Sequence, residues 1–190
     1  MASINDYLQW RGDIPITKNF PFNEIDSMIL ARFSYLRFDK IKIKKEETIE
    51  SISKKMKILD NDEFHFNGDK ELITYLGESN RFKSMLVTDF VKNNDKAAEK
   101  QFGAVTVHIS NKEMYVSFIG TDSTIYGWKE DFNMAFMDSV PCQFAGKKYL
   151  EDVAEKYPEK SIRIGGHSKG GNVALFSGMT VRKKNPKQNN

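Results

Sequence analysis

The stretch Ile162-Arg-Ile-Gly-Gly-His-Ser168-Lys-Gly-Gly-Asn-Val-Ala174 decides the fold of this chain of 190 residues. It contains the pattern Gly-x-Ser-x-Gly, with Gly166 and Gly170 placed two residues before and two residues after Ser168. Apolar residues alternate before the pattern, as in a strand, and small residues follow it, as in a helix that packs closely on a sheet. The stretch therefore predicts a sharp strand-to-helix turn on which the Ser168 hydroxyl projects above the sheet.

Two phosphate-binding motifs also join a strand, a glycine-rich turn and a helix. The Walker motif requires Gly-Lys followed by Ser or Thr, whereas Lys169 precedes two glycines and an asparagine. The dinucleotide motif Gly-x-Gly-x-x-Gly has no match in this turn. The spacing thus favours Ser168 as a nucleophile, with the backbone N–H of Lys169 facing the oxyanion that develops during acyl transfer.

A second segment, Tyr115-Val-Ser-Phe-Ile-Gly-Thr-Asp122, reads as a strand that ends in a turn. A hydrolase with a serine nucleophile needs a second oxyanion donor from a loop beside that serine. Gly120 permits a sharp turn, and Thr121 offers both a backbone N–H and a hydroxyl. We therefore expect Gly120-Thr121 to supply this donor; the alternative is an ordinary turn beside a packed Trp128.

The order of the predicted elements indicates an α/β fold, with a sheet flanked by helices. We place an N-cap at Asp69 and turns at Asn93-Asn94-Asp95 and Asn111-Lys112. Residues 1–181 are expected to form one domain, and residues 182–190 a disordered basic tail. The predicted helices span residues 22–36, 46–59, 69–77, 128–136, 144–157 and 169–181, and the predicted strands span 85–91, 102–109, 114–119 and 161–165.

Composition and charge exclude several classes of function. A net charge of +3 is too small to indicate a nucleic-acid partner. No run of about 18 apolar residues could span a membrane, and the first residues, Met1-Ala-Ser-Ile-Asn-Asp6, do not form a secretory signal. The single cysteine, Cys142, fits a reducing cytoplasm and is expected to fill space in the core rather than to react. We expect neither a metal nor a cofactor.

Five segments carry a resemblance to a known family. They are Tyr7-Leu-Gln-Trp-Arg-Gly-Asp13, Pro21-Phe-Asn-Glu-Ile-Asp26, Gly120-Thr-Asp122, Gly127-Trp-Lys-Glu-Asp-Phe-Asn133 and Gly165-Gly-His-Ser-Lys-Gly-Gly-Asn172. With these segments the chain resembles the class 3 lipase-like α/β-hydrolases, and more closely an uncharacterised bacterial family within that group. The resemblance extends to about residue 178 and implies an α/β-hydrolase fold.

The resemblance also implies roles for particular residues. Ser168 would be the acyl-accepting nucleophile, and Thr121 would form the oxyanion hole with the backbone N–H of Lys169. Asp131 would hold the Thr121 loop in place. The substrate would be a small-molecule or lipid ester. One position departs from the pattern, because Ile119 stands where such lipases usually carry an arginine that braces the loop.

The residues that would activate Ser168 are missing from the pattern. In this fold an acid and a histidine follow the nucleophile along the chain, but only 22 residues follow Ser168 and none is Asp, Glu or His. His65 is expected to be simply exposed, His108 to be a surface or packed residue, and His167 to pack beside the turn. We therefore expect the chain to be the N-terminal part of a longer hydrolase and to be inactive by itself.

Three interpretations remain open from the sequence. The first is a serine hydrolase, and the second is an acyltransferase, which differs only in the molecule that accepts the acyl group. The third is a pseudoenzyme or binding module, which could associate with a partner or with itself through an exposed sheet edge.

Overall fold

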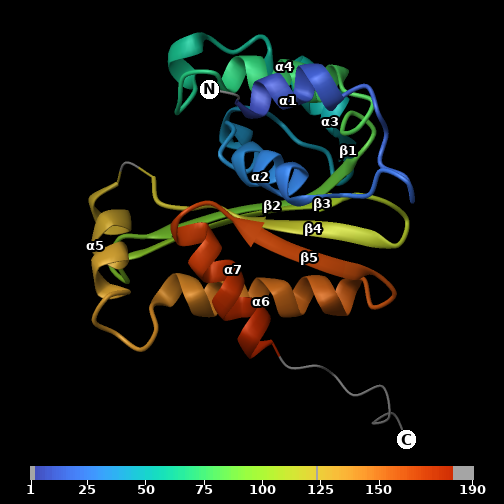
Figure 1. Cartoon of the computed structure of the whole chain (residues 1–190). Helices are drawn as coiled ribbons and strands as arrows, with labels where there is room; N and C mark the ends of the chain where they lie inside the picture. The colour runs from blue at the N-terminus through green and yellow to red at the C-terminus, as the bar shows by residue number, and fades with distance from the viewer. Residues whose placement is uncertain (1–2, 123, 182–190) are drawn as a thin grey trace, which may run out of the picture.

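A five-stranded mixed sheet with helices on both faces forms the centre of the molecule in the computed structural model (Figure 1). The structure describes residues 3–122 and 124–181. The strands follow chain order across the sheet, and each neighbouring pair is antiparallel except β4 and β5, which run parallel. This arrangement confirms the predicted α/β class. The strands are β1 (Glu47–Thr48), β2 (Leu86–Asp95), β3 (Lys100–His108), β4 (Glu113–Phe118) and β5 (Ser161–Gly166).

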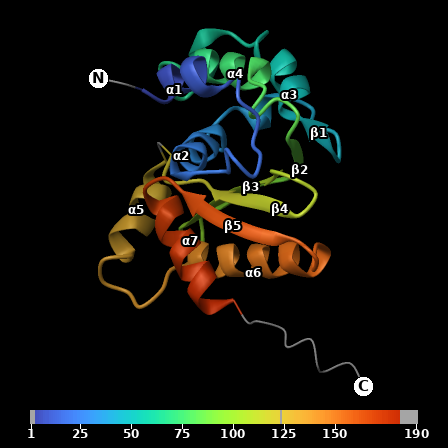
Figure 2. The same ribbon diagram turned by 45° about the vertical axis from the view of Figure 1, so that its right-hand side comes forward.

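The helices form two layers, one on each face of the sheet, and one further helix lies at the end of the sheet (Figures 1 and 2). The first layer contains α1 (Ile4–Arg11), α2 (Glu24–Phe33), α3 (Ile49–Met56) and α4 (Asp69–Glu78). The opposite layer contains α6 (Pro141–Lys156) and α7 (Lys169–Thr180). The remaining helix, α5 (Ile125–Asn133), connects β4 to α6 and so begins the crossover that makes β4 and β5 parallel.

Side chains alternate along the central strands and fill a separate core on each face of the sheet. On β4, Tyr115 faces the first helical layer, whereas Val116 and Phe118 face α6 and α7. The second core also contains Cys142, and burial raises the pKa of its thiol. A protonated, buried thiol is a poor nucleophile, which agrees with the prediction that Cys142 fills space.

Three local predictions from the sequence were wrong. Glu47–Thr48, predicted as helix, form β1 because they pair with β2, and Thr48 then caps α3 through its side chain. Asp69 is the first residue of α4 rather than its N-cap; Gly68 takes the cap position, and the Asp69 carboxylate instead pairs with Arg32 at 2.7 Å. Asn93-Asn94-Asp95 belongs to β2, because that strand continues in register with β3 beyond the expected turn.

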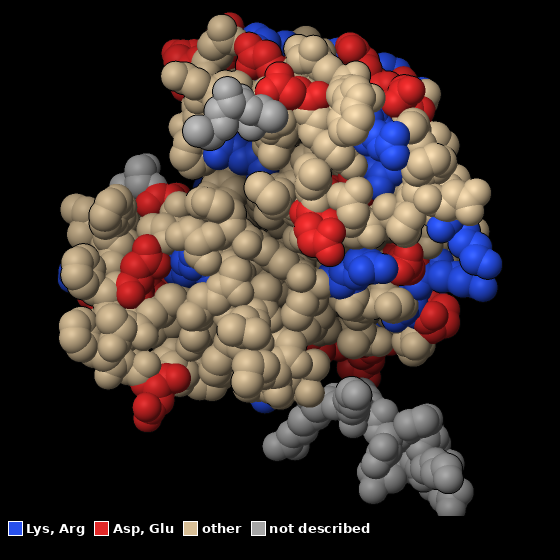
Figure 3. Space-filling model, in the orientation of Figure 1, with Lys and Arg blue, Asp and Glu red and all other residues tan. Residues whose placement is uncertain are grey.

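The sequence also left α1 unassigned, although Ser3 caps it and Asp6 completes the capping box. The basic tail predicted at residues 182–190 lies outside the described residues. Among the helices that the structure describes, none is long and apolar enough to cross a membrane. Charged residues gather over the first helical layer and around the β-strand ends, whereas the surface over α7 carries few of them (Figure 3).

A buried ion pair holds α2 in place. The Arg81 guanidinium donates to both Asp26 carboxylate oxygens, at 2.7 and 2.5 Å, and the two side chains are 2% and 0% exposed. Arg81 also donates to the carbonyl of Pro21, so it joins α2 to the segment that precedes it. Asp26 accepts the backbone N–H of Asn23 and thereby completes the cap of α2.

We expect Asp26→Ala to lower the free energy of unfolding by about 3 kcal/mol, because it leaves the buried Arg81 charge without its partner. The control is Glu50→Ala, which removes the exposed ion pair with Lys54 and is expected to change stability little. Urea unfolding followed by circular dichroism measures both. Equal effects of the two substitutions would contradict the structural role of the buried pair.

Candidate functional site

Ser168 lies on the predicted strand-to-helix turn, between the end of β5 and the start of α7. Its backbone has φ 55° and ψ −125°, a conformation that non-glycine residues rarely adopt. A Cβ at Gly166 would lie 2.5 Å from the carbonyl oxygen of Phe118, and one at Gly170 would lie 2.1 Å from the same oxygen. Both glycines of the pattern are therefore required, because the turn lies against the end of β4 without room for a side chain.

The Ser168 residue is exposed at the first turn of α7. Within residues 3–122 and 124–181 its hydroxyl has no hydrogen-bond partner. The helix N-terminus provides a positive electrostatic environment for a developing anion there. The geometry is therefore that of an accessible hydroxyl on a strained turn, with no base beside it in the described part of the chain.

Each of the three histidines contacts groups other than the Ser168 hydroxyl. The ring of His167 lies beside Tyr35, with 3.4 Å between Nδ1 and the tyrosine oxygen, as expected for a residue that packs beside the turn. His108 contacts Lys160 at 2.8 Å through Nδ1 and packs edge-on against Tyr157, far along the sheet. His65 lines a pocket beside the Gly120-Thr121 turn. The prediction that it is exposed is confirmed, but its place at a pocket was missed.

The strand-to-helix turn from Gly166 to Gly170 is called the elbow below, and the Gly120-Thr121 turn lies directly against it. A Cβ at Gly120 would lie 2.4 Å from the carbonyl oxygen of His167. The Thr121 hydroxyl donates to an Asp131 carboxylate oxygen, so the structure brings these two predicted residues together. Because a carboxylate can only accept, that hydroxyl proton is already engaged. Thr121 therefore has only its backbone N–H to offer to an oxyanion.

A glutamine braces this turn in place of the arginine expected from the family pattern. The side-chain amide nitrogen of Gln101 donates to the carbonyl oxygen of Gly120 at 2.9 Å, and Gln101 is 2% exposed. The Ile119 side chain instead packs on Gly103. Sequence reasoning missed Gln101, because a lone glutamine on a strand has no motif around it.

The side chain of Lys169 is buried behind the turn. Its ammonium contacts Glu130 at 3.0 Å, and the side chains of the pair are 1% and 0% exposed. Glu130 also accepts the backbone N–H groups of Gln101 and Cys142. Glu130 stands next to Asp131 in the segment that carried the family resemblance, and that adjacency was the signal from which it could have been found.

Tyr35, at the end of the α2 segment, connects the first helical layer to both turns. Its hydroxyl lies 3.4 Å from the carbonyl oxygen of His167, and a Cβ at Gly120 would lie 2.0 Å from the same hydroxyl. Burial raises the pKa of Tyr35 to about 12. The phenol is therefore neutral at pH 7, and its hydroxyl lies between the two turns as a hydrogen-bonding group.

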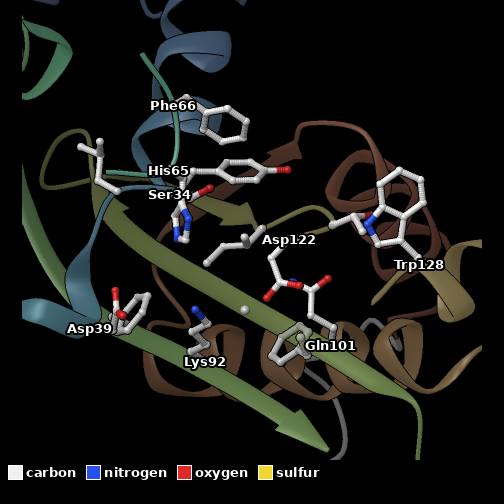
Figure 4. A pocket seen from close by; sticks show the side chains of 15 residues that line it. Ser34, Asp39, His65, Phe66, Lys92, Gln101, Asp122 and Trp128 are labelled. Atoms are coloured by element: carbon white, nitrogen blue, oxygen red, sulfur yellow. The ribbon is translucent and has the colours of Figure 1, made fainter. Parts of the chain in front are cut away.

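A pocket of about 300 Å³ opens beside Thr121 (Figure 4). Phe66 and Trp128 stand on different sides of it, and His65 and Lys92 contribute polar groups. Burial lowers the pKa of His65, and the nearby Arg37 and Lys92 charges lower it further, so its ring is neutral at pH 7. The pocket thus combines aromatic walls with a few polar groups. Among the described residues, no group of three or more His, Cys, Asp or Glu could hold a metal ion.

Comparison with known proteins identifies the family. The model of the family described as Mbeg1-like matches residues 76–188, which is more than half of the chain. The chain therefore belongs to the Mbeg1-like family. The matched region includes β2 to β5, the Gly120-Thr121 turn and the elbow. No curated protein and no solved structure matches the chain.

We expect Gly170→Ala to lower the free energy of unfolding by about 3 kcal/mol, because its Cβ would collide with backbone that has no room to move. The matched control on α7 is Gly178→Ala, whose Cβ meets only the end of the Ile164 side chain. That side chain can rotate away, so the control is expected to change stability by less than about 1 kcal/mol. Thermal unfolding compares the two, and a Gly170→Ala variant as stable as the control would contradict the close packing of the elbow.

Proposed function

We propose that this Mbeg1-like chain has an α/β-hydrolase fold and is a serine hydrolase with Ser168 as the nucleophile. The observation that carries the proposal is the conformation of Ser168, a non-glycine residue with φ 55° at a strand-to-helix turn. Strain of this kind persists where the surrounding structure enforces it, and it often serves a site. Here the strained residue is exposed at the start of α7.

The proposed reaction is acyl transfer. The Ser168 oxygen attacks the carbonyl carbon of an ester while a base takes the hydroxyl proton, and the carbonyl oxygen becomes an anion. The backbone N–H groups of Lys169 and Thr121 stabilise that anion. The C–O bond then breaks, the alcohol leaves with a proton, and water or another acceptor releases the acyl group from Ser168. A hydrolase and an acyltransferase differ only in that last acceptor.

The pocket beside Thr121 supports an ester with a compact apolar part. Its aromatic residues Phe66 and Trp128 offer apolar contact, and Lys92 and His65 can contact a polar group of the substrate. Because the pocket adjoins the turn that supplies the proposed oxyanion donor, a substrate bound there would place its carbonyl near the elbow.

The base is the part of the mechanism that the described residues do not supply at Ser168. An external base can replace it, so we expect imidazole to accelerate the acylation of Ser168 by a p-nitrophenyl ester. Intact mass should show one acyl group per chain, located on Ser168 by peptide mapping. Ser168→Ala should lower the imidazole-dependent formation of the adduct about 100-fold, because the oxyanion donors then have no nucleophile to assist.

The matched control for this experiment is Ser161→Ala, which removes the side chain of another exposed serine, at the start of the strand that leads to the Ser168 turn. It should acylate at the rate of the unsubstituted chain. Adduct formation that is equal in Ser168→Ala, or absent from the unsubstituted chain at saturating imidazole, would refute the proposed function.

One observation favours a second candidate function, a non-catalytic module that binds a second copy of the chain. Among the described strands β5 pairs only with β4, so its other edge has unpaired backbone groups. Leu175 and Met179 of α7, which are 64% and 77% exposed, line a groove along that edge together with Ile164. Strand pairing across the edge would cover both features.

If that candidate is correct, sedimentation velocity should show a dimer whose proportion rises with concentration. The double substitution Leu175→Glu/Met179→Glu should weaken the dimer by at least about tenfold, because it places charges in the covered groove. Ile58→Glu is the control, since Ile58 is also exposed but lies after α3. A monomer at all concentrations would exclude this candidate without affecting the first.

A further inference from the structure

We propose that the buried side chains of Lys169 and Gln101 position the oxyanion hole. In this view Lys169 acts twice: its backbone N–H is one oxyanion donor, and its side chain sets the direction of the other, the N–H of Thr121. The inference rests on the proposed function for its chemistry, but the direction of the Thr121 N–H can be measured independently of any activity.

The first step is the environment of the Lys169 ammonium. Its three contacts are the side-chain oxygen of Gln101 at 2.6 Å, the backbone oxygen of Gln101 at 3.2 Å and Glu130 at 3.0 Å. An ammonium has three donors and no acceptor, so these contacts use its full capacity. The group is buried, and a buried charge with all its hydrogen bonds made is held firmly in place.

The second step is the orientation of the Gln101 side chain. An amide group can face either way, but only its oxygen can accept a proton from an ammonium. The Lys169 charge therefore fixes the oxygen on its own side. The amide nitrogen is left facing the carbonyl oxygen of Gly120, to which it donates at 2.9 Å.

The third step is the geometry of the peptide bond between Gly120 and Thr121. In a trans peptide the C=O and the N–H point in opposite directions, and the described chain contains no cis peptide bond. Because Gln101 holds the Gly120 carbonyl, the Thr121 N–H points away from Gln101. Thr121 lines the pocket beside the turn, whereas Gly120 packs against the elbow. Lys169 and Gln101 thus set the two proposed donors relative to one another.

A simpler possibility is that Lys169 and Gln101 only stabilise the fold. Gln101→Glu separates the two roles at a pH that keeps the new side chain ionised, because a carboxylate still accepts from Lys169 but offers no donor to the Gly120 carbonyl. Two oxygens would then face each other, and the Gly120-Thr121 peptide would turn. Gln143→Glu is the matched control. The Gln143 side-chain amide, on α6, donates to Asn172 of α7, the helix that also carries Lys169, and Gln143 does not contact the Gly120-Thr121 turn.

We expect Gln101→Glu to lower the maximal rate of imidazole-assisted acylation of Ser168 by about 100-fold, at the lower end of the range for a lost oxyanion donor. The ester concentration at half-maximal rate should change less than the rate, because Gln101, which lines the pocket, keeps its size in this variant. Two-dimensional ¹H–¹⁵N NMR should show a large shift of the Thr121 amide in this variant. Gln143→Glu should leave the rate and the Thr121 amide unchanged, even if it lowers stability equally.

A second variant removes the charges together. Lys169→Met/Glu130→Gln leaves no unpaired buried charge, so it is expected to fold, while it frees the Gln101 amide to turn over. The Thr121 amide should then shift or broaden. An unshifted Thr121 amide in Gln101→Glu would overturn the positioning role, as would an acylation rate equal to that of the control. Absence of any Ser168 acylation, with the Thr121 amide shifted, would refute the proposed function but support the positioning.

Discussion

The contact between the elbow and the end of β4 is the constraint on which the rest of the site depends. The Phe118 carbonyl oxygen lies so close to Gly166 and Gly170 that neither position has space for a methyl group. This close approach is possible because Phe118 and Gly166 are register partners in the parallel pair of β4 and β5. It brings two turns that are almost fifty residues apart in the sequence into contact, and it gives Ser168 its unusual backbone conformation.

A layer of buried polar side chains lies behind these two turns. Glu130 and Lys169 form its charged centre, and Gln101 connects that centre to Gly120. Such a network is costly unless every member has its partners, and here the ammonium and both carboxylate oxygens have them. Its members come from β3, α5 and α7, so three elements must assemble before the network closes.

The sequence predicted the elbow and its neighbouring turn well, because each depends on a short pattern of residues with a steric reason. The glycines around Ser168 are an example, since their spacing alone indicates where a backbone must approach. The α/β class followed from the order of periodic segments. The exact elements were harder: Glu47–Thr48 has the composition of a helix start, and only pairing with β2 makes it a strand. The position of Gln101 could not be predicted, because its importance comes from residues that are distant in the sequence.

The anchoring of α5 has a consequence for how this surface can behave. The outward face of α5 and its following turn displays Ile125, Trp128, Phe132 and Phe136, which are 60% to 86% exposed. The inward face of the same helix carries Glu130, held by two backbone N–H groups and one ammonium. Any swing of α5 away from the sheet would expose a charge whose partners stay behind. The position of α5 is therefore fixed, and its aromatic face is preformed. A molecule that binds there would not require a movement of the helix.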